Sequence, residues 1–248
     1  MSLCRFILIL WLIGCSAAHA GAWTRAKGDS FVARSARYFT TSTAAASGEA
    51  FSKNNSSIYV EFGLTDDMTI GVEHDAGAGS SADFIEEVET SRFFVRRSLW
   101  RSTGGAVLSS EVSNGLIFTS GDSVKAPMRL ETRTRFLFGV GFDSEILGTG
   151  WFDSALGVRG YAGRTTDELR AEATVGFHPV EDWLVMTQVF AMKALTPGAD
   201  QQDAISVALS LGYKAEGPNT IVFGIRQDAM AKGATRGTEA SLTIWTNF

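Results

Sequence analysis

The chain has 248 residues, 45% of them hydrophobic, and a formal net charge of −5 at pH 7. This mild acidity without a basic patch argues against nucleic acid as a partner, because phosphate binding requires clustered Lys and Arg. Beyond residue 20 there is no run of about 18 apolar residues, which excludes a transmembrane helix in that part of the chain.

Residues 1–20 are predicted to be a signal peptide, with Arg5 as the positive start, a short apolar core and a small-residue cleavage site ending at Ala20. Its removal leaves 21 basic residues against 27 acidic ones, a net charge of −6. It also removes Cys4 and Cys15, so residues 21–248 contain no thiol and no sulfur-based metal site. In an alternative interpretation the stretch LIGC is a lipoprotein processing site, and Cys15 becomes the lipidated first residue.

The hydrophobic residues of 21–248 alternate with polar ones in segments of about ten residues, which turn-rich connections separate. This pattern predicts an all-β fold, a transmembrane up-and-down antiparallel β-barrel of about 12 strands. An even number of strands places both ends of the barrel chain on the same side. The predicted strands cover 29–42, 54–64, 67–77, 85–100, 104–115, 127–141, 150–161, 166–178, 182–193, 202–214, 219–229 and 236–248.

The connections after even-numbered strands are mostly compact and are predicted to face the periplasm. Those after odd-numbered strands are longer and richer in Ser, Gly and Ala, as extracellular loops tend to be. The predicted extracellular loops are 43–53, 78–84, 116–125 and 195–201. The connection 143–149 is long for an inner turn. Four tryptophans fall near the periplasmic strand ends and are predicted to form an aromatic girdle at the membrane interface, namely Trp100, Trp151, Trp183 and Trp245.

When each strand is sorted by parity, one face is mostly apolar and is predicted to meet lipid. It includes Ile58, Val60, Phe62, Ile70, Val72, Phe136, Phe138, Ile205, Val207, Leu209, Leu211, Phe223 and Ile225. A soluble β-sandwich has the same period but turns its apolar face inward. The charged face favours the barrel, because it pairs Arg with carboxylates and nearly lacks Lys, as expected for bidentate pairing in a confined space. The residues predicted to line the lumen are Arg92, Arg96, Arg129, Glu131, Arg133, Arg135, Asp153, Arg159, Glu168, Arg170 and Glu172, with Glu61, Glu73, Glu111, Arg226 and Glu239 as further candidates.

The last predicted strand, TEASLTIWTNF, alternates to its final residue, Phe248. Such a strand needs no cover if it pairs with the first strand of a closed barrel. Together with the signal peptide and the repeated amphipathic strands, this ending resembles bacterial outer-membrane β-barrel proteins. The resemblance implies an outer-membrane location and recognition of Phe248 by the barrel-assembly machinery. The stretches GAWTRAKGDSF and YVEFGLTDDMTIGVE further resemble uncharacterised proteobacterial transporter barrels, including a group linked to phenol-degradation pathways.

Catalytic signals are sparse. Ser113 and Asn114 resemble the His-x-Ser-Asn stretch of lipid A deacylases, but Glu111 stands where that family has His, and a carboxylate is a poor base for a serine hydroxyl. His74 is interpreted as a surface histidine beside a loop. No metal-binding spacing and no phosphate-binding Gly-rich loop occur in the sequence, so we predict no metal, no cofactor and no enzymatic activity.

The sequence therefore predicts a monomeric outer-membrane barrel that passes small polar or anionic solutes passively. The arginines of the inner face could form a positive ladder for anions. They could equally brace the lumen by pairing with the carboxylates, and bracing is favoured because opposite charges are equally numerous. Two alternatives remain open: a barrel enzyme that modifies lipid at the outer rim through Ser113, and a non-conducting structural barrel.

Overall fold

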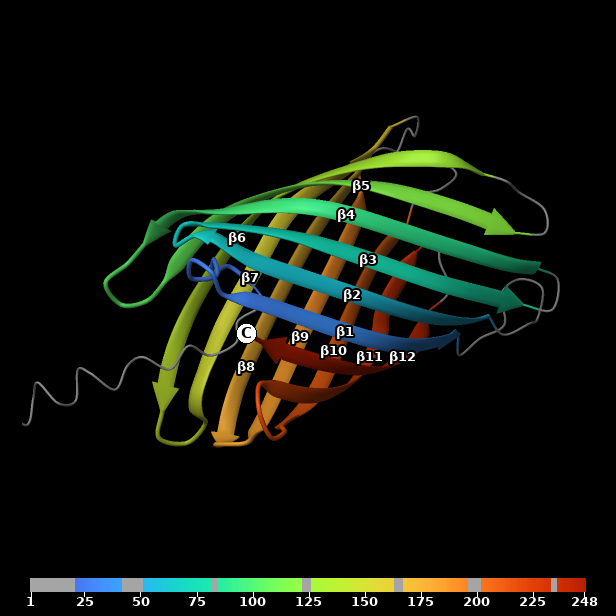
Figure 1. Cartoon of the computed structure of the whole chain (residues 1–248). Coiled ribbons are helices and arrows are strands. Elements are labelled where there is room, and N and C mark those ends of the chain that lie inside the picture. The colour runs from blue at the N-terminus through green and yellow to red at the C-terminus, as the bar shows by residue number, and fades with distance from the viewer. Residues whose placement is uncertain are drawn as a thin grey trace, which may run out of the picture.

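The computed structural model describes residues 21–41, 51–81, 84–121, 126–162, 167–195, 202–232 and 236–248. They form a closed barrel in which twelve antiparallel strands follow one another in chain order (Figure 1). The predicted signal peptide and most of the predicted outer loops 43–53 and 195–201 lie outside the described residues. The strands are β1 Ser30–Thr41, β2 Ser52–Thr65, β3 Met68–Ser81, β4 Phe84–Arg101, β5 Val107–Gly121, β6 Ala126–Ser144, β7 Gly148–Tyr161, β8 Glu168–Val180, β9 Trp183–Ala194, β10 Asp203–Lys214, β11 Asn219–Lys232 and β12 Gly237–Asn247.

The barrel closes by pairing its first strand with its last. β1 and β12 pair from Phe31 with Asn247 to Thr41 with Gly237. At the end of this seam the amide of Phe248 donates to the carbonyl of Ser30 at 2.9 Å, and the amide of Ser30 donates to the carbonyl of Phe248 at 3.1 Å. The final strand therefore has no free edge, and the prediction of a 12-stranded all-β barrel is confirmed.

The alternation of side chains separates the two faces of the wall as predicted. Apolar residues of one parity are exposed, for example Leu209 at 61% and Ile225 at 62%. Their neighbours of the other parity, such as Ala208 and Val222, are buried with the charged side chains of the interior. Within the described residues no helix is long and apolar enough to span a membrane.

Several strands extend further than the sequence pattern predicts. β3 continues to Ser81 and β5 to Gly121, so segments predicted as loops are ladder-paired strand. The connection predicted over 143–149 is a three-residue turn, because β6 and β7 pair up to Ser144 with Gly148. Gly148 has a φ of +74°, and a Cβ there would lie 2.1 Å from the carbonyl oxygen of His178. Only glycine fits this position, and the connection is shorter than the predicted bounds because Asp143 and Ser144 belong to β6 and Gly148 to β7.

The predicted tryptophan girdle is half wrong. Trp100 and Trp183 are exposed, at 51% and 41%. Trp151 is 3% exposed and forms an apolar cluster against which Trp245 packs. Both have the parity of the inner face, so they fill the barrel interior near the end predicted to be periplasmic and do not meet the lipid interface.

Candidate functional site: the charged barrel interior

Arg96 is the centre of the interior charge network. Its side chain is 1% exposed and lies between two carboxylates, 2.7 Å from Glu61 and 2.9 Å from Glu111. It also donates to the hydroxyl of Tyr59 at 3.1 Å and to the carbonyl oxygen of Trp23 at 3.2 Å. A buried cation requires such partners, since an unpaired one would cost several kcal/mol of desolvation.

A second group of ion pairs lies on the same wall. Arg92 contacts Glu73 at 2.8 Å and Glu131 at 2.7 Å, and Arg159 also pairs with Glu131. The strand register brings Glu73 and Arg92 together, because Glu73 on β3 lies directly opposite Arg92 on β4. Glu131 is 1% exposed and holds both arginines, so these residues brace the interior.

Glu111 joins the first group to a row of arginines on β6. It accepts from Arg135 at 2.8 Å and lies 3.5 Å from Arg133. Arg135 reaches onward to Glu172 on β8 at 3.6 Å. Three arginines thus surround one carboxylate, and Arg133 has the longest contact of the three.

The remaining predicted lumen residues lie further along the strands. Arg170 pairs with Glu168 at 2.9 Å, and Arg159 lies 3.9 Å from the same carboxylate. Asp153 accepts from the indole of Trp151 at 3.2 Å. Arg129 lies in β6, in register with Ile117. Parity on β1 and β3 could also have identified Arg37 and Asp75, which form an ion pair that the sequence analysis missed.

The interior also holds part of the segment that precedes β1, for which the sequence predicted no position. Ala22 is completely buried, and its carbonyl oxygen accepts a hydrogen bond from Ser109. The amide of Arg25 donates to Thr69 at 2.7 Å, and its guanidinium pairs with Glu61. Residues 21–25 therefore lie inside the barrel, at the end predicted to be periplasmic, whereas Ala26 and Lys27 are exposed. Since this segment has no strand period, periodicity could not locate it.

Trp23 anchors this segment. It packs against the apolar cluster of Trp151, Leu184, Met186 and Val222. A Cβ at Gly139 would lie 2.6 Å from the Trp23 ring, so the β6 wall is bare where the indole rests. The segment narrows the periplasmic part of the lumen.

An inner cavity of about 380 Å³ remains beside the charge network. Its lining mixes acidic and basic groups, including Glu73, Arg133, Arg135, Asp153 and Glu172. Polar groups such as Gln188 and Thr243 also border it. The cavity can accommodate a small polar or charged molecule.

The predicted candidate serine faces this interior. Ser113 is 3% exposed, and Glu111, its neighbour on the same face, is held by Arg96, Arg133 and Arg135. A carboxylate so engaged cannot serve as a base, and lipid does not reach a buried inner residue. This geometry gives Ser113 no role in lipid hydrolysis.

The barrel is similar in fold to solved structures of other proteins. An outer-membrane channel from Pseudomonas putida F1 superposes with a TM-score of 0.67 at 10% identity, covering 94% of this chain and 100% of that one. This is the fold of a bacterial outer-membrane β-barrel. The predicted fold and the apolar outer wall of an outer-membrane protein agree with it.

Other outer-membrane barrels are also similar. The β domain of the Bordetella autotransporter BrkA gives a TM-score of 0.59 at 8% identity, covering 90% of this chain and 100% of its own. The NanC porin superposes with a TM-score of 0.55 at 10% identity, and the match covers 87% of this chain and 98% of the porin chain. Comparison with protein-family models and with curated proteins gives no match. The resemblance to the phenol-degradation group stays a prediction.

Proposed function

We propose that this barrel lies in the bacterial outer membrane and passes small polar or anionic solutes through its narrow, charge-lined lumen without an energy source. Similar folds in an outer-membrane channel and a porin support a channel role. The interior supports the solute class, since charged and polar side chains border the inner cavity.

The observation that carries the anionic preference is the incomplete pairing of Arg133. Its nearest carboxylate oxygens lie at 3.5 Å in Glu111 and 3.9 Å in Glu73, whereas Arg96 has both of its carboxylates within 2.9 Å. The Nε of Arg133 has no hydrogen-bond partner among the described residues. Since Arg133 borders the inner cavity, its charge acts on a passing ion more than a neutralised arginine does.

The test is the reversal potential of the reconstituted protein across a KCl gradient in a planar bilayer. A unit charge about 8 Å from the ion, at an effective dielectric of about 40, contributes about 1 kcal/mol. We therefore expect Arg133→Gln to lower the anion-to-cation permeability ratio up to about fivefold. Arg226→Gln is the matched control, because Arg226 pairs with Glu239 at 3.2 Å, and it should change the ratio less.

The segment 21–25 supports one competing function, that of a non-conducting structural barrel, since it occupies the lumen at the end predicted to be periplasmic. The same recordings decide between the two. Conductance steps from the wild-type protein support a channel. A complete absence of steps, with the protein folded, rejects it.

The remaining parts of the proposal concern export and assembly. Cleavage after Ala20 would release the chain at Gly21, directly before the segment inside the barrel. Phe248 is 72% exposed, which leaves its ring accessible to the assembly machinery. The closed seam between β1 and β12 supports a monomer, because no strand edge is left to pair with a second copy.

A further inference from the structure

The outer wall carries a serine and a histidine in direct contact. His74 on β3 pairs in register with Ser91 on β4, and the histidine Nδ1 lies 2.9 Å from the serine Oγ. Both side chains have the parity of the exposed Val72 and Phe93, so they face outward. His74, predicted to lie beside a loop, lies within β3. This distance is that of a nucleophile and its base.

Two further groups complete the arrangement. Glu89, two residues from Ser91 on the same strand and face, has a carboxylate oxygen 3.9 Å from the His74 Nε2. Asn114 on β5 pairs with Phe93, while Ser91 pairs with Leu116. Asn114 is thus a diagonal neighbour of Ser91, about 7–8 Å away between Cα atoms and within side-chain reach.

The amide of Asn114 has a defined orientation. Its Oδ1 accepts a hydrogen bond from the Thr132 hydroxyl at 2.9 Å, which turns the NH₂ branch away from β6. An NH₂ group beside a nucleophilic serine can donate to the oxyanion of a tetrahedral intermediate. The strand backbone cannot do this, since its amides are used in the ladder.

The position of His74 and Ser91 along their strands indicates which substrate they could contact. Along β3, outward residues run from Ile70 and Val72 to His74, and along β4 from Val95 and Phe93 to Ser91 and Glu89. The pair therefore lies where polar side chains interrupt the outward apolar residues of these two strands, on the side remote from Phe248. Exposed apolar residues recur beyond it, at Ile85 on β4 and at Leu116 and Phe118 on β5. In a membrane protein of the orientation that the sequence predicts, the pair thus faces the outer leaflet on the side of its headgroups, within reach of the acyl esters of lipids.

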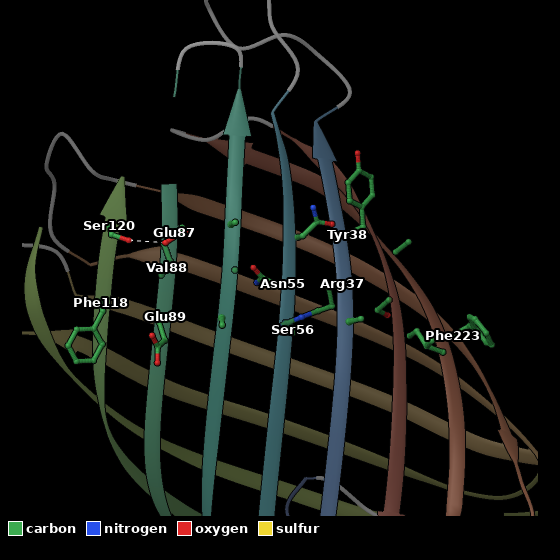
Figure 2. Close-up of a pocket in the computed structure, with 18 residues that line it drawn as sticks. Arg37, Tyr38, Asn55, Ser56, Glu87, Val88, Glu89, Phe118, Ser120 and Phe223 are labelled. Carbon is green, nitrogen blue, oxygen red and sulfur yellow. Dashed lines mark hydrogen bonds between the residues drawn. The ribbon is translucent and has the colours of Figure 1, made fainter. Parts of the chain in front are cut away.

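The outer wall is hollowed beside His74, over β12, β1 and β2 and so on the side of β3 away from Ser91. A hollow of about 390 Å³ is lined by His74 together with Ile58, Leu242 and Ile244. A larger one of about 810 Å³ adjoins it across Ala36 and Ser56, and Figure 2 shows Glu89 and Phe118 on one side of β3 with Tyr38 and Phe223 on the other. Small side chains form its floor, including Ala76, Ala78 and Ala240. The smaller hollow combines the apolar side chains of Ile58, Leu242 and Ile244 with Arg34 and His74, so an acyl chain can lie against it beside a charged or polar headgroup.

We propose that Ser91, His74, Glu89 and Asn114 form an outward-facing site that hydrolyses acyl esters of outer-leaflet lipids. His74 takes the Ser91 proton as Oγ attacks the acyl carbonyl carbon, and Asn114 donates to the resulting oxyanion. The ester C–O bond breaks, and the leaving alcohol takes the proton from His74. Water then attacks the acyl-serine and gives a proton to His74, which returns it to Ser91 as the fatty acid leaves. Glu89 stabilises the imidazolium in both halves.

The test uses the full barrel refolded into vesicles of phosphatidylethanolamine and phosphatidylglycerol. It measures fatty-acid release and covalent labelling by a fluorophosphonate probe. We expect the wild type to label and hydrolyse, and Ser91→Ala to lose the label completely. His74→Gln and Asn114→Leu should each lower the rate about 10²-fold or more, the usual contribution of a general base or an oxyanion donor.

Ser110→Ala is the matched control, because Ser110 faces outward on β5 beside Arg97 and Phe136 and has no histidine partner in the register. It should retain wild-type hydrolysis and labelling. Heat-dependent gel migration verifies that every variant is folded. A wild type that neither labels nor releases fatty acid overturns the proposal, as does a folded Ser91→Ala variant with wild-type activity. The outcome is separable from channel function, since Ser91 lies outside the lumen and its variant should conduct normally.

Discussion

Replacing Arg96 by Met should destabilise the barrel more than the loss of any other single ion-pair residue described above. Arg96 is 1% exposed and contacts two carboxylates that are themselves buried, Glu61 and Glu111. Removing one partner of a buried pair costs about 3–5 kcal/mol because a charge is left without compensation. In the variant Glu61 still pairs with Arg25, and Glu111 still pairs with Arg135. We therefore expect the free energy of unfolding to fall by about 3 kcal/mol, the lower end of this range.

The assay is equilibrium urea unfolding of the protein refolded into phospholipid vesicles, followed by tryptophan fluorescence. Arg226→Met is the control, since Arg226 forms one ion pair among the described residues, with Glu239, and is 34% exposed. A partly exposed pair of this kind contributes about 0–1 kcal/mol. If Arg96→Met lowers the free energy of unfolding no more than Arg226→Met, the interior network does not brace the barrel and the reasoning fails.

Three further changes test other parts of the structure. Trp23→Ala removes the anchor of segment 21–25, so single-channel conductance should rise in bilayer recordings, and unchanged conductance would show that the segment does not limit the pore. Leu209→Arg places a charge on the outer wall and should lower the free energy of unfolding in vesicles by about 2–4 kcal/mol, whereas a neutral effect would contradict lipid exposure there. Deleting Phe248 should slow assembly, measured as the rate at which the heat-modifiable band appears in cells. An unchanged rate would show that the assembly machinery does not read this residue.

Much of the fold could be predicted because the side chains of a strand alternate between lipid and the barrel interior, so the residue types alternate along the sequence. Leu209 and Leu211 alternate with Ala208 and Ser210 whether or not the neighbouring strands are known. The same parity identified Arg96 and Glu111 as residues of one face, which the structure joins at 2.9 Å.

The predicted tryptophan girdle was wrong at two positions because a tryptophan near a strand end can face either the lipid interface or the barrel interior. Trp151 and Trp245 were assigned to the lipid interface from their place near strand ends, although their parity is that of the inner face. Position along a strand gives depth in the membrane, but only parity gives the side of the wall.

The sequence by itself determined the strand number, the apolar exterior and the charged interior, because each depends on alternation within about ten residues. Only the tertiary structure decided that residues 21–25 lie inside the barrel, that Arg133 is the least neutralised of the arginines around Glu111, and that His74 contacts Ser91. These depend on the register between strands and on contacts between distant segments. A local period of two carries no information about either.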